Sequence, residues 1–379
     1  MIIIEGVILI NIVCACDDRY VKHLAVLIIS IINNTKTRNI NFYIINGGIH
    51  QENIDKLEEI FITNKAKFRF LMTNEDEIKK LKVDKHLSTA TYYRILIPNL
   101  LSNDIDKVVY LDSDIVVNGD ISELWNMDIS EFSIGAKKEA ANNQRNEYLN
   151  MPKKAPYFNA GVLLMNLNKW RQCNHSSNVF TYLNKFGDNL LYHDQDGINA
   201  LLYNDSLEIP SEWNILSQDV YGNSSFRGPK LVHFTEASKP WQLLNNHPFK
   251  KEYEKYLAMT PWKDDIPPEN AIIHKLLMDK RIIIFGSGGS GLRLLERVTE
   301  LNGTVSYFLD NNKDLSGKVA KGKKIHTPNV LADENIDEIF IIIASMYYVE
   351  IEEQLTELGL KRLKHFVSLG YENELLKEW

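Results

Sequence analysis

The stretch DKVVYLDSDIVVNGD, residues 106–120, places an apolar run directly before two aspartates. Residues 107–111 are rich in Val, Tyr and Leu, a composition typical of a buried strand. Asp112 and Asp114 follow at once, with Ser113 between them. Because ligands of open α/β sheets bind beyond the carboxyl ends of the strands, the stretch predicts a ligand site at this strand end.

The residues before this stretch alternate between strand and helix patterns, which predicts a parallel or mostly parallel sheet with helices packed on it. Strand patterns occur at 7–15, 40–46 and 67–72, and helix patterns at 20–34, 52–63 and 88–101. Beyond residue 118 the pattern is more mixed, with strand patterns at 158–165 and 230–234 and a helix pattern at 193–203.

A second α/β pattern follows a polar segment with three prolines, TPWKDDIPPEN at residues 260–270. Such a segment is typical of a linker. The sequence therefore predicts a first domain at 1–260, a linker at 261–270 and a small Rossmann-like α/β domain at 271–379.

The second pattern opens with a strand and a glycine-rich turn. Gly286, Gly288 and Gly291 fit the G-x-G-x-x-G fingerprint, and Asp310 ends the next strand pattern at about the expected distance. Ligand binding does not follow from this fingerprint alone. A nucleotide-binding role and a structural or oligomerising role both stay open.

Composition excludes several classes of protein. The chain has 379 residues and a formal net charge of −7, which argues against a general nucleic-acid binder. Cys14, Cys16 and Cys173 are too few for a disulfide framework and favour a reducing cytoplasm. Residues 1–15 are apolar but lack a basic start, which favours a first strand over a signal peptide. No later segment has the roughly 20 apolar residues of a membrane span, so at most a peripheral contact with the inner membrane face is expected.

The two aspartates could hold one divalent cation. Carboxylate oxygens suit Mg²⁺ or Mn²⁺, which neutralise charge on a departing nucleoside diphosphate. His233 ends the apolar run LVHF and could complete the shell, favouring Mn²⁺. Lys239 follows and could neutralise phosphate as a point charge. Taken singly, these residues also fit a solvated turn, a core histidine and a solvated loop.

The order of the motifs resembles family 8 glycosyltransferases, the retaining sugar-nucleotide enzymes that include bacterial lipopolysaccharide galactosyl- and glucosyltransferases and glycogenin. The resemblance implies the nucleotide-diphospho-sugar transferase (GT-A) fold, with a mixed, mostly parallel sheet. It rests on six blocks in the family's order, which span about residues 10–241: NIVCACDDRYVKHLAVLIISI, STATYYRILIPNLL, DKVVYLDSDIVVNGDISELW, YFNAGVLLMNLNKW, HDQDGINALL and LVHFTEASKPW.

The resemblance also implies roles for single residues. Asp17 is similar to the residue that pairs with uracil, and a carboxylate can accept the uracil N3–H. The implied metal ligands are Asp112, Asp114 and His233. The implied donor-binding residues are Ala15, Asp17, Tyr20, Arg94, Asp112, Ser113, Asn159, Ala160 and Lys239. Asp194 and Gln195 in HDQD belong with Asn159 and Ala160 to the implied sugar-binding set, and they are the catalytic candidates.

Two positions depart from the family pattern. Arg19 stands where many relatives have a small polar residue, which could alter the nucleoside contacts. Glu236 stands where the family usually has glycine. A carboxylate near pyrophosphate would be repulsive unless it points away or pairs with a cation.

The implied reaction transfers glucose or galactose from UDP-glucose or UDP-galactose to a glycan, glycolipid or glycoprotein acceptor, with retention. A front-face path, in which the leaving phosphate deprotonates the acceptor hydroxyl, is favoured because the amide of Gln195 is a poor nucleophile. Residues 139–156 are polar, and they could form part of the acceptor site or be a solvated, variable loop. A sugar-1-phosphate nucleotidylyltransferase-like enzyme and a non-catalytic UDP-sugar-binding protein are the alternatives.

Overall fold

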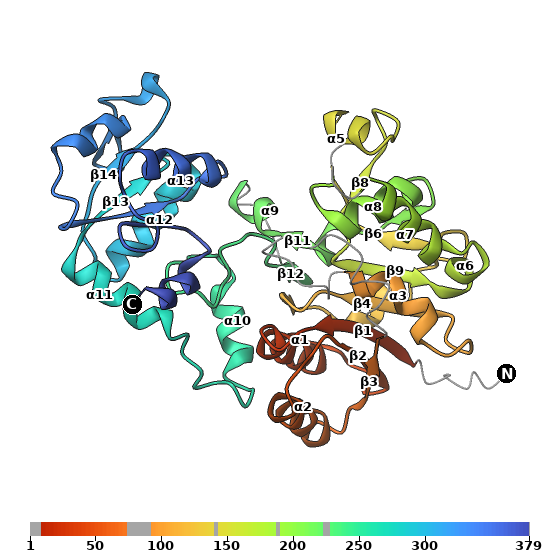
Figure 1. The fold of residues 1–379 in the computed structure, drawn as a ribbon. Coiled ribbons are helices and arrows are strands. Elements are labelled where there is room, and N and C mark those ends of the chain that lie inside the picture. Colours follow the sequence, from red (N-terminus) through yellow and green to blue (C-terminus); the bar gives the residue numbers. More distant parts are fainter. Residues whose placement is uncertain (1–8, 74–91, 140–142, 187–189, 223–227, 379) are drawn as a thin grey trace. The chain divides into compact units, whose positions relative to one another are not determined.

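The computed structural model describes residues 9–73, 92–139, 143–186, 190–222 and 228–378 (Figure 1). The chain forms two compact units, Met1–Phe234 with Lys255–Lys263, and Thr235–Glu254 with Asp264–Trp379. The predicted domain boundaries at 260 and 271 assign residues 235–254 differently, and they remain a prediction about the folding units.

The first unit is built on a seven-stranded mixed sheet with the strand order β10-β6-β9-β4-β1-β2-β3. Four neighbouring strands are parallel, β9 is antiparallel to both β4 and β6, and β10 is parallel to β6. The strands are β1 (Ile10–Cys16), β2 (Ile40–Asn46), β3 (Lys67–Met72), β4 (Lys107–Leu111), β6 (Ile134–Ala136), β9 (Val162–Asn166) and β10 (Ser206–Glu208). The predicted mixed, mostly parallel sheet is confirmed.

Helices bury the apolar side chains of this sheet. The helix α1 (Val21–Asn34) is apolar on nearly every side, and its residues from Val21 to Ile32 are buried apart from Lys22. The remaining helices include α2 (Gln51–Thr63), α3 (Tyr93–Leu100), α6 (Leu167–Gln172), α7 (His175–Phe186) and α8 (His193–Leu202). One core cluster joins Tyr110 of β4, Leu163 of β9 and Ile198 of α8, so α8 is anchored beside the ends of the central strands.

A second, three-stranded sheet brings a late part of the chain next to the end of β4. It has the order β11-β12-β5, formed by β5 (Ile115–Val117), β11 (Ile215–Leu216) and β12 (Leu231–His233). The strand β12 is antiparallel to β5, and this register pairs His233 with Ile115. Because Ile115 directly follows Asp114, this pairing places His233 next to Asp114.

The second unit contains a six-stranded sheet with the order β15-β16-β14-β13-β17-β18, parallel apart from the β15–β16 pair. Its strands are β13 (Arg281–Phe285), β14 (Val305–Leu309), β15 (Val319–Ala320), β16 (Lys323–His326), β17 (Ile339–Ile343) and β18 (Phe366–Ser368). The helices α11 (Glu269–Asp279), α12 (Gly289–Glu300) and α13 (Tyr348–Glu357) accompany it. The helix α10 (Lys250–Leu257) precedes them in the sequence, and its residues are divided between the two units.

The glycine-rich turn of this unit connects β13 to α12. A Cβ at Gly291 would lie 1.9 Å from the carbonyl oxygen of Gly286, so the close approach requires glycine. The carboxylate of Asp310 accepts hydrogen bonds from the N–H and Oγ of Ser287, which ties the end of β14 to the turn. A pocket of about 310 Å³ opens beside these residues, also lined by Tyr347 and Glu350.

Glu372 is buried in the second unit, and its carboxyl should make the free energy of unfolding depend on pH. Burial raises the pKa of its carboxyl from 4.5 to about 7, although the backbone N–H of Gly370 donates to Oε2. The fold therefore favours the neutral form, and stability should fall as the pH rises from about 4.5 to about 7. Glu372→Gln, which stays neutral, should gain about 1–3 kcal/mol over the native chain at pH 8 and little at pH 4.

Urea unfolding of both proteins at several pH values measures this difference. The exposed Glu357→Gln is the matched control, and we expect no pH-dependent gain from it. An equal gain for Glu372→Gln at pH 4 and pH 8 would contradict the assigned ionisation.

Candidate metal centre and its surroundings

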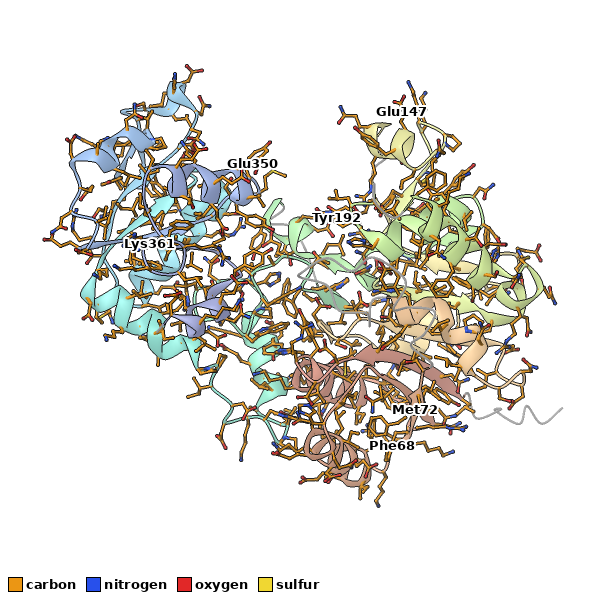
Figure 2. All side chains as sticks on the ribbon, viewed as in Figure 1. Phe68, Met72, Glu147, Tyr192, Glu350 and Lys361 are labelled. Carbon is orange, nitrogen blue, oxygen red and sulfur yellow. The ribbon has the colours of Figure 1, made fainter. Side chains whose placement is uncertain are left out.

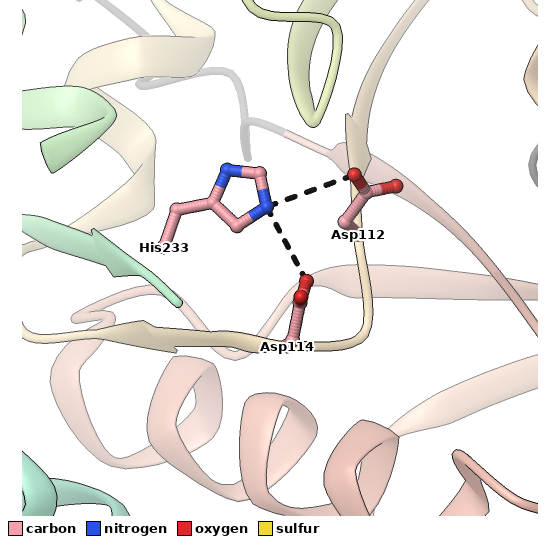
Figure 3. Close-up of side chains that lie close together, drawn as sticks. All are labelled: Asp112, Asp114 and His233. Carbon is pink, nitrogen blue, oxygen red and sulfur yellow. Dashed lines mark ion pairs between the residues drawn. The ribbon is translucent and has the colours of Figure 1, made fainter. Parts of the chain in front are cut away.

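Asp112, Asp114 and His233 converge at the carboxyl end of β4 (Figure 3). The Nε2 atom of His233 lies 3.3 Å from Oδ1 of Asp114 and 3.7 Å from Oδ2 of Asp112. One ligand atom from each side chain lies within 4.8 Å of the other two. Two carboxylate oxygens and one imidazole nitrogen are a donor set that fits a divalent first-row cation such as Mn²⁺.

Gly161 leaves the space that these side chains occupy. A Cβ at this position would lie 2.1 Å from Cε1 of His233 and 2.6 Å from Oδ2 of Asp112. The carbonyl oxygen of Gly161 also accepts the backbone N–H of Asp112 at 2.9 Å. Glycine at this position is therefore a steric condition for bringing the histidine and the aspartate together.

A chain of amides orients His233. The Nδ2 of Asn214 donates to Oδ1 of Asn159 at 3.0 Å, so the Oδ1 of Asn214 faces Nδ1 of His233 at 3.1 Å. Because an amide oxygen can only accept, Nδ1 of the imidazole carries the proton. Its Nε2 lone pair then points toward the two aspartates, which is the orientation that a metal-binding histidine needs.

Arg94 of α3 links the aspartate pair to the HDQD segment. Its guanidinium contacts Oδ1 of Asp112 at 3.0 Å and Oδ2 of Asp194 at 2.9 Å, and it donates to the carbonyl oxygen of Ala160. Burial alone would lower its pKa, but the two carboxylates raise it above the ordinary value. A permanently charged arginine, only 6% exposed, therefore holds both carboxylates in place.

The FNAG turn places two of the predicted sugar-binding residues beside Gln195. The strand predicted at 158–165 is wrong in its middle, because β8 (Tyr157–Phe158) ends before Asn159 and β9 begins at Val162. Oδ1 of Asn159 accepts the N–H of Gly161, which closes a tight turn in place of sheet pairing. Oε1 of Gln195 accepts from the backbone N–H of Ala160 at 2.9 Å and from Nδ2 of Asn159 at 3.2 Å.

The first strand-to-helix turn carries Asp17 and Tyr20. Oδ1 of Asp17 accepts from the N–H groups of Arg19 and Tyr20, and its Oδ2 pairs with the guanidinium of Arg19 at 2.9 Å. The departure at position 19 therefore supplies a cation to the predicted uracil-binding carboxylate. Ser113 joins this turn to the aspartate pair, because its Oγ donates to the carbonyl oxygen of Ala15 at 2.9 Å.

Lys239 and Glu236 belong to the second unit. Glu236 lies 4.0 Å from the guanidinium of Arg293, and burial raises the pKa of its carboxyl. The position where a glycine is usual therefore has a carboxylate with a cation partner. The predicted contact of Lys239 with phosphate stays a prediction.

The first unit thus gathers most of the predicted site around one strand end, namely Ala15, Arg94, Asp112, Ser113, Asp114, Asn159, Ala160, Asp194, Gln195 and His233. Asn214 and Tyr110 were not predicted. The hydroxyl of Tyr110 donates to Oδ1 of Asp112 at 2.7 Å, and the alternation of β4 could have indicated it. Asn214 lies in no motif that would single it out.

Two known protein families match parts of this chain. The family described as glycosyl transferase family 8 matches residues 11–244, and the family described as C2185-like, N-terminal, matches residues 278–366. Among the helices within the described ranges, none has the length and apolar character needed to cross a membrane.

Two similar proteins and one similar structure illustrate the match. General stress protein A of Bacillus subtilis (strain 168) is 32% identical over 270 residues, 66% of this chain and 94% of that protein. The lipopolysaccharide 1,2-glucosyltransferase of Escherichia coli (strain K12) is 28% identical over 68% of this chain and 80% of its own length. The crystal structure of galactosyltransferase LgtC with donor and acceptor sugar analogues superposes with a TM-score of 0.62 at 23% identity, over 67% of this chain and 99% of that one.

Proposed function

The chain belongs to glycosyltransferase family 8, and we propose that it transfers a hexose, glucose or galactose, from a UDP-sugar to a glycan or glycoconjugate acceptor with retention. The observation that carries this proposal is the meeting of Asp112, Asp114 and His233 beside the Arg94–Asp194 pair. A cation site next to a buried, charge-compensated carboxylate is suited to holding a nucleotide diphosphate and the sugar attached to it.

The three side chains would hold Mn²⁺, or alternatively Mg²⁺, with the imidazole nitrogen favouring Mn²⁺. The cation supplies charge neutralisation for the departing UDP. Ala15, Asp17 and Tyr20 would form the base pocket, with Asp17 accepting the uracil N3–H. Lys239 would contact phosphate. The acceptor is a glycan, glycolipid or glycoprotein in the cytoplasm or at the inner face of the membrane.

The pairing of the HDQD carboxylates supports a front-face mechanism. Asp194 is 3% exposed and pairs with Arg94, and Asp196 is 1% exposed and pairs with Arg145 at 2.6 Å. An ion-paired, buried carboxylate is a weak nucleophile because attack would separate it from its cation. We therefore propose that Asp194 binds a sugar hydroxyl and that the leaving phosphate takes the acceptor proton.

This mechanism predicts that no sugar becomes attached to Asp194 or Asp196 during turnover. Intact-protein and peptide mass spectrometry of enzyme quenched with UDP-glucose or UDP-galactose should show only the unmodified HDQD peptide. A glycosyl adduct on Asp194 that forms and decays at the rate of turnover would overturn the front-face path and leave the transferase activity standing.

Asn214 should set the affinity for the cation, because it fixes the tautomer of His233. Partners that orient a metal-binding histidine typically contribute about 10- to 100-fold in affinity, so we expect Asn214→Ala to weaken Mn²⁺ binding by this factor. Titration calorimetry with Mn²⁺ alone measures the effect. Asn41→Ala, which removes an amide that donates to Oδ1 of Asn11 across the β1–β2 pair, is the control and should bind Mn²⁺ as the native chain does.

Release of UDP tests the proposed function directly. The purified protein is incubated with a panel of UDP-sugars and Mn²⁺, Mg²⁺ or EDTA, with and without a glycan acceptor mixture. We expect UDP release from UDP-glucose or UDP-galactose that requires the cation and falls at least about 100-fold in Asp114→Ala. Binding of a UDP-sugar without any release would favour a non-catalytic binding protein instead.

A further inference from the structure

The side-chain amide of Gln195 is held in one orientation. The backbone N–H of Ala160 can only donate, so the atom that faces it at 2.9 Å is the amide oxygen. The nitrogen therefore points the other way, where Nε2 donates to the hydroxyl of Tyr157 at 3.0 Å. An amide nitrogen has two hydrogens, and this contact uses one of them.

The hydroxyl of Tyr157 is itself fixed by two charged groups. It accepts from Nη2 of Arg145 at 2.7 Å and donates to Oδ1 of Asp196 at 2.7 Å. Burial and the neighbouring Asp196 carboxylate raise the pKa of this phenol, so it stays neutral and keeps its proton. Because its proton goes to Asp196, the Tyr157 oxygen can only accept from Gln195 and Arg145.

Arg145 of α5 (Asn143–Tyr148) contacts both Tyr157 and Asp196. Its guanidinium lies 4.1 Å from the ring centre of Tyr157 and 3.8 Å from that of Tyr192, the residue before α8. Figure 2 labels Tyr192 and, in α5, Glu147. It also donates twice to Oδ1 of Asp196, through Nε at 3.1 Å and Nη2 at 2.6 Å. A planar guanidinium that contacts two rings and a buried carboxylate has little rotational freedom.

From these contacts we propose that Tyr157, held by Arg145 and Asp196, is a positioning residue that fixes the amide of Gln195 with its second N–H directed at the donor sugar. The inference rests on the proposed function and on the family resemblance, which implies that Gln195 belongs to the residues that bind the donor sugar. It assigns a role to Arg145, which lies in the polar segment 139–156. Arg145 thereby acts on the donor side through Tyr157 and Asp196.

Removing one oxygen atom should release the amide. Tyr157→Phe keeps the ring and its packing against Arg145 but removes the acceptor for Nε2 of Gln195. Misplacement of a group at a reacting centre by about 1 Å can cost about 100-fold in rate, so we expect kcat to fall about 10- to 100-fold. The KM for the UDP-sugar and the affinity for UDP should change less than about threefold, since neither the cation ligands nor the base pocket is touched.

A double-mutant cycle with Gln195→Ala separates positioning from a general structural role. A residue that acts through Gln195 has no further effect once Gln195 is gone, so Tyr157→Phe should not lower kcat in the Gln195→Ala background. Tyr182→Phe is the matched control, because its hydroxyl donates its proton to the carbonyl oxygen of Leu149 at 3.0 Å rather than to Asp196 or Gln195. That variant should keep native kcat.

Hydrogen exchange at the backbone N–H of Ala160 gives a second readout that needs no turnover. This N–H is bonded to Gln195, so its exchange should accelerate about tenfold in Tyr157→Phe and in Gln195→Ala, and no further in the double variant. Additive losses in kcat, or native exchange at Ala160 in Tyr157→Phe, would overturn the proposal. If the native protein releases no UDP, the proposed function fails, while the exchange experiment still decides whether Tyr157 positions Gln195.

Discussion

Gly161→Ala should abolish metal-dependent turnover, with a loss of UDP release of at least about 1000-fold, because several kcal/mol of cation-mediated stabilisation disappear with the site. The added methyl group would lie 2.1 Å from Cε1 of His233 and 2.6 Å from Oδ2 of Asp112, well inside van der Waals contact. One of these ligands must then move away from the cation. UDP release and Mn²⁺ calorimetry on the same preparation measure both consequences.

The control for this prediction is Gly288→Ala in the second unit. Nothing lies within 4 Å of a Cβ built at Gly288, so this methyl group enters open space. We expect native turnover and native Mn²⁺ affinity from the control. Native Mn²⁺ affinity in Gly161→Ala would contradict the assignment of His233 and Asp112 to one cation.

Replacing Arg94 by methionine should cause the largest loss of stability among the site variants. The change leaves Asp112 and Asp194 next to a buried, uncharged side chain, and breaking buried ion pairs in this way typically costs about 3–5 kcal/mol. Activity should fall as well, because Asp194 loses the group that holds it. Urea unfolding at neutral pH gives the change in the free energy of unfolding.

Two further variants serve as a conservative replacement and as a control for this prediction. Arg94→Lys keeps the charge but not the fork of donors that reaches Asp112, Asp194 and the carbonyl of Ala160, so it should recover only part of the stability. Arg69→Met, at an exposed position of β3, should change stability by less than about 0.5 kcal/mol. A cost at Arg94→Met as small as that at Arg69→Met would contradict a buried, charge-bridging arginine.

Local sequence patterns were sufficient for the central strands. The patterns at 40–46, 67–72 and 107–111 match β2, β3 and β4 in both bounds, because each is a continuous β-rich run with polar residues at its ends. Two of the three candidate ligands could be singled out for the same reason, since Asp112 and Asp114 directly follow such a run. The third candidate, His233, also ends an apolar run, LVHF, but taken singly it fitted a core histidine as well, and its strand β12 is only three residues long.

Long-range contacts could not be predicted from these patterns. His233 lies beside Asp114 because β12 pairs with β5. The sequence of these two short strands does not indicate that they pair with each other. The same holds for Arg145 and Asn214, whose roles arise from hydrogen bonds to distant residues. The apolar pattern at 158–165 predicted an uninterrupted strand. Instead, the side chain of Asn159 accepts the N–H of Gly161 and closes a turn between β8 and β9.

The position of the bound cation tests the account most directly. Crystals grown with Mn²⁺ and UDP are measured at the manganese absorption edge, and the anomalous difference map locates the ion. We predict one strong peak within coordinating distance of Asp112, Asp114 and His233, and its loss in Asp114→Ala. A manganese peak that lies away from these three side chains, or that persists unchanged in Asp114→Ala, would contradict the account.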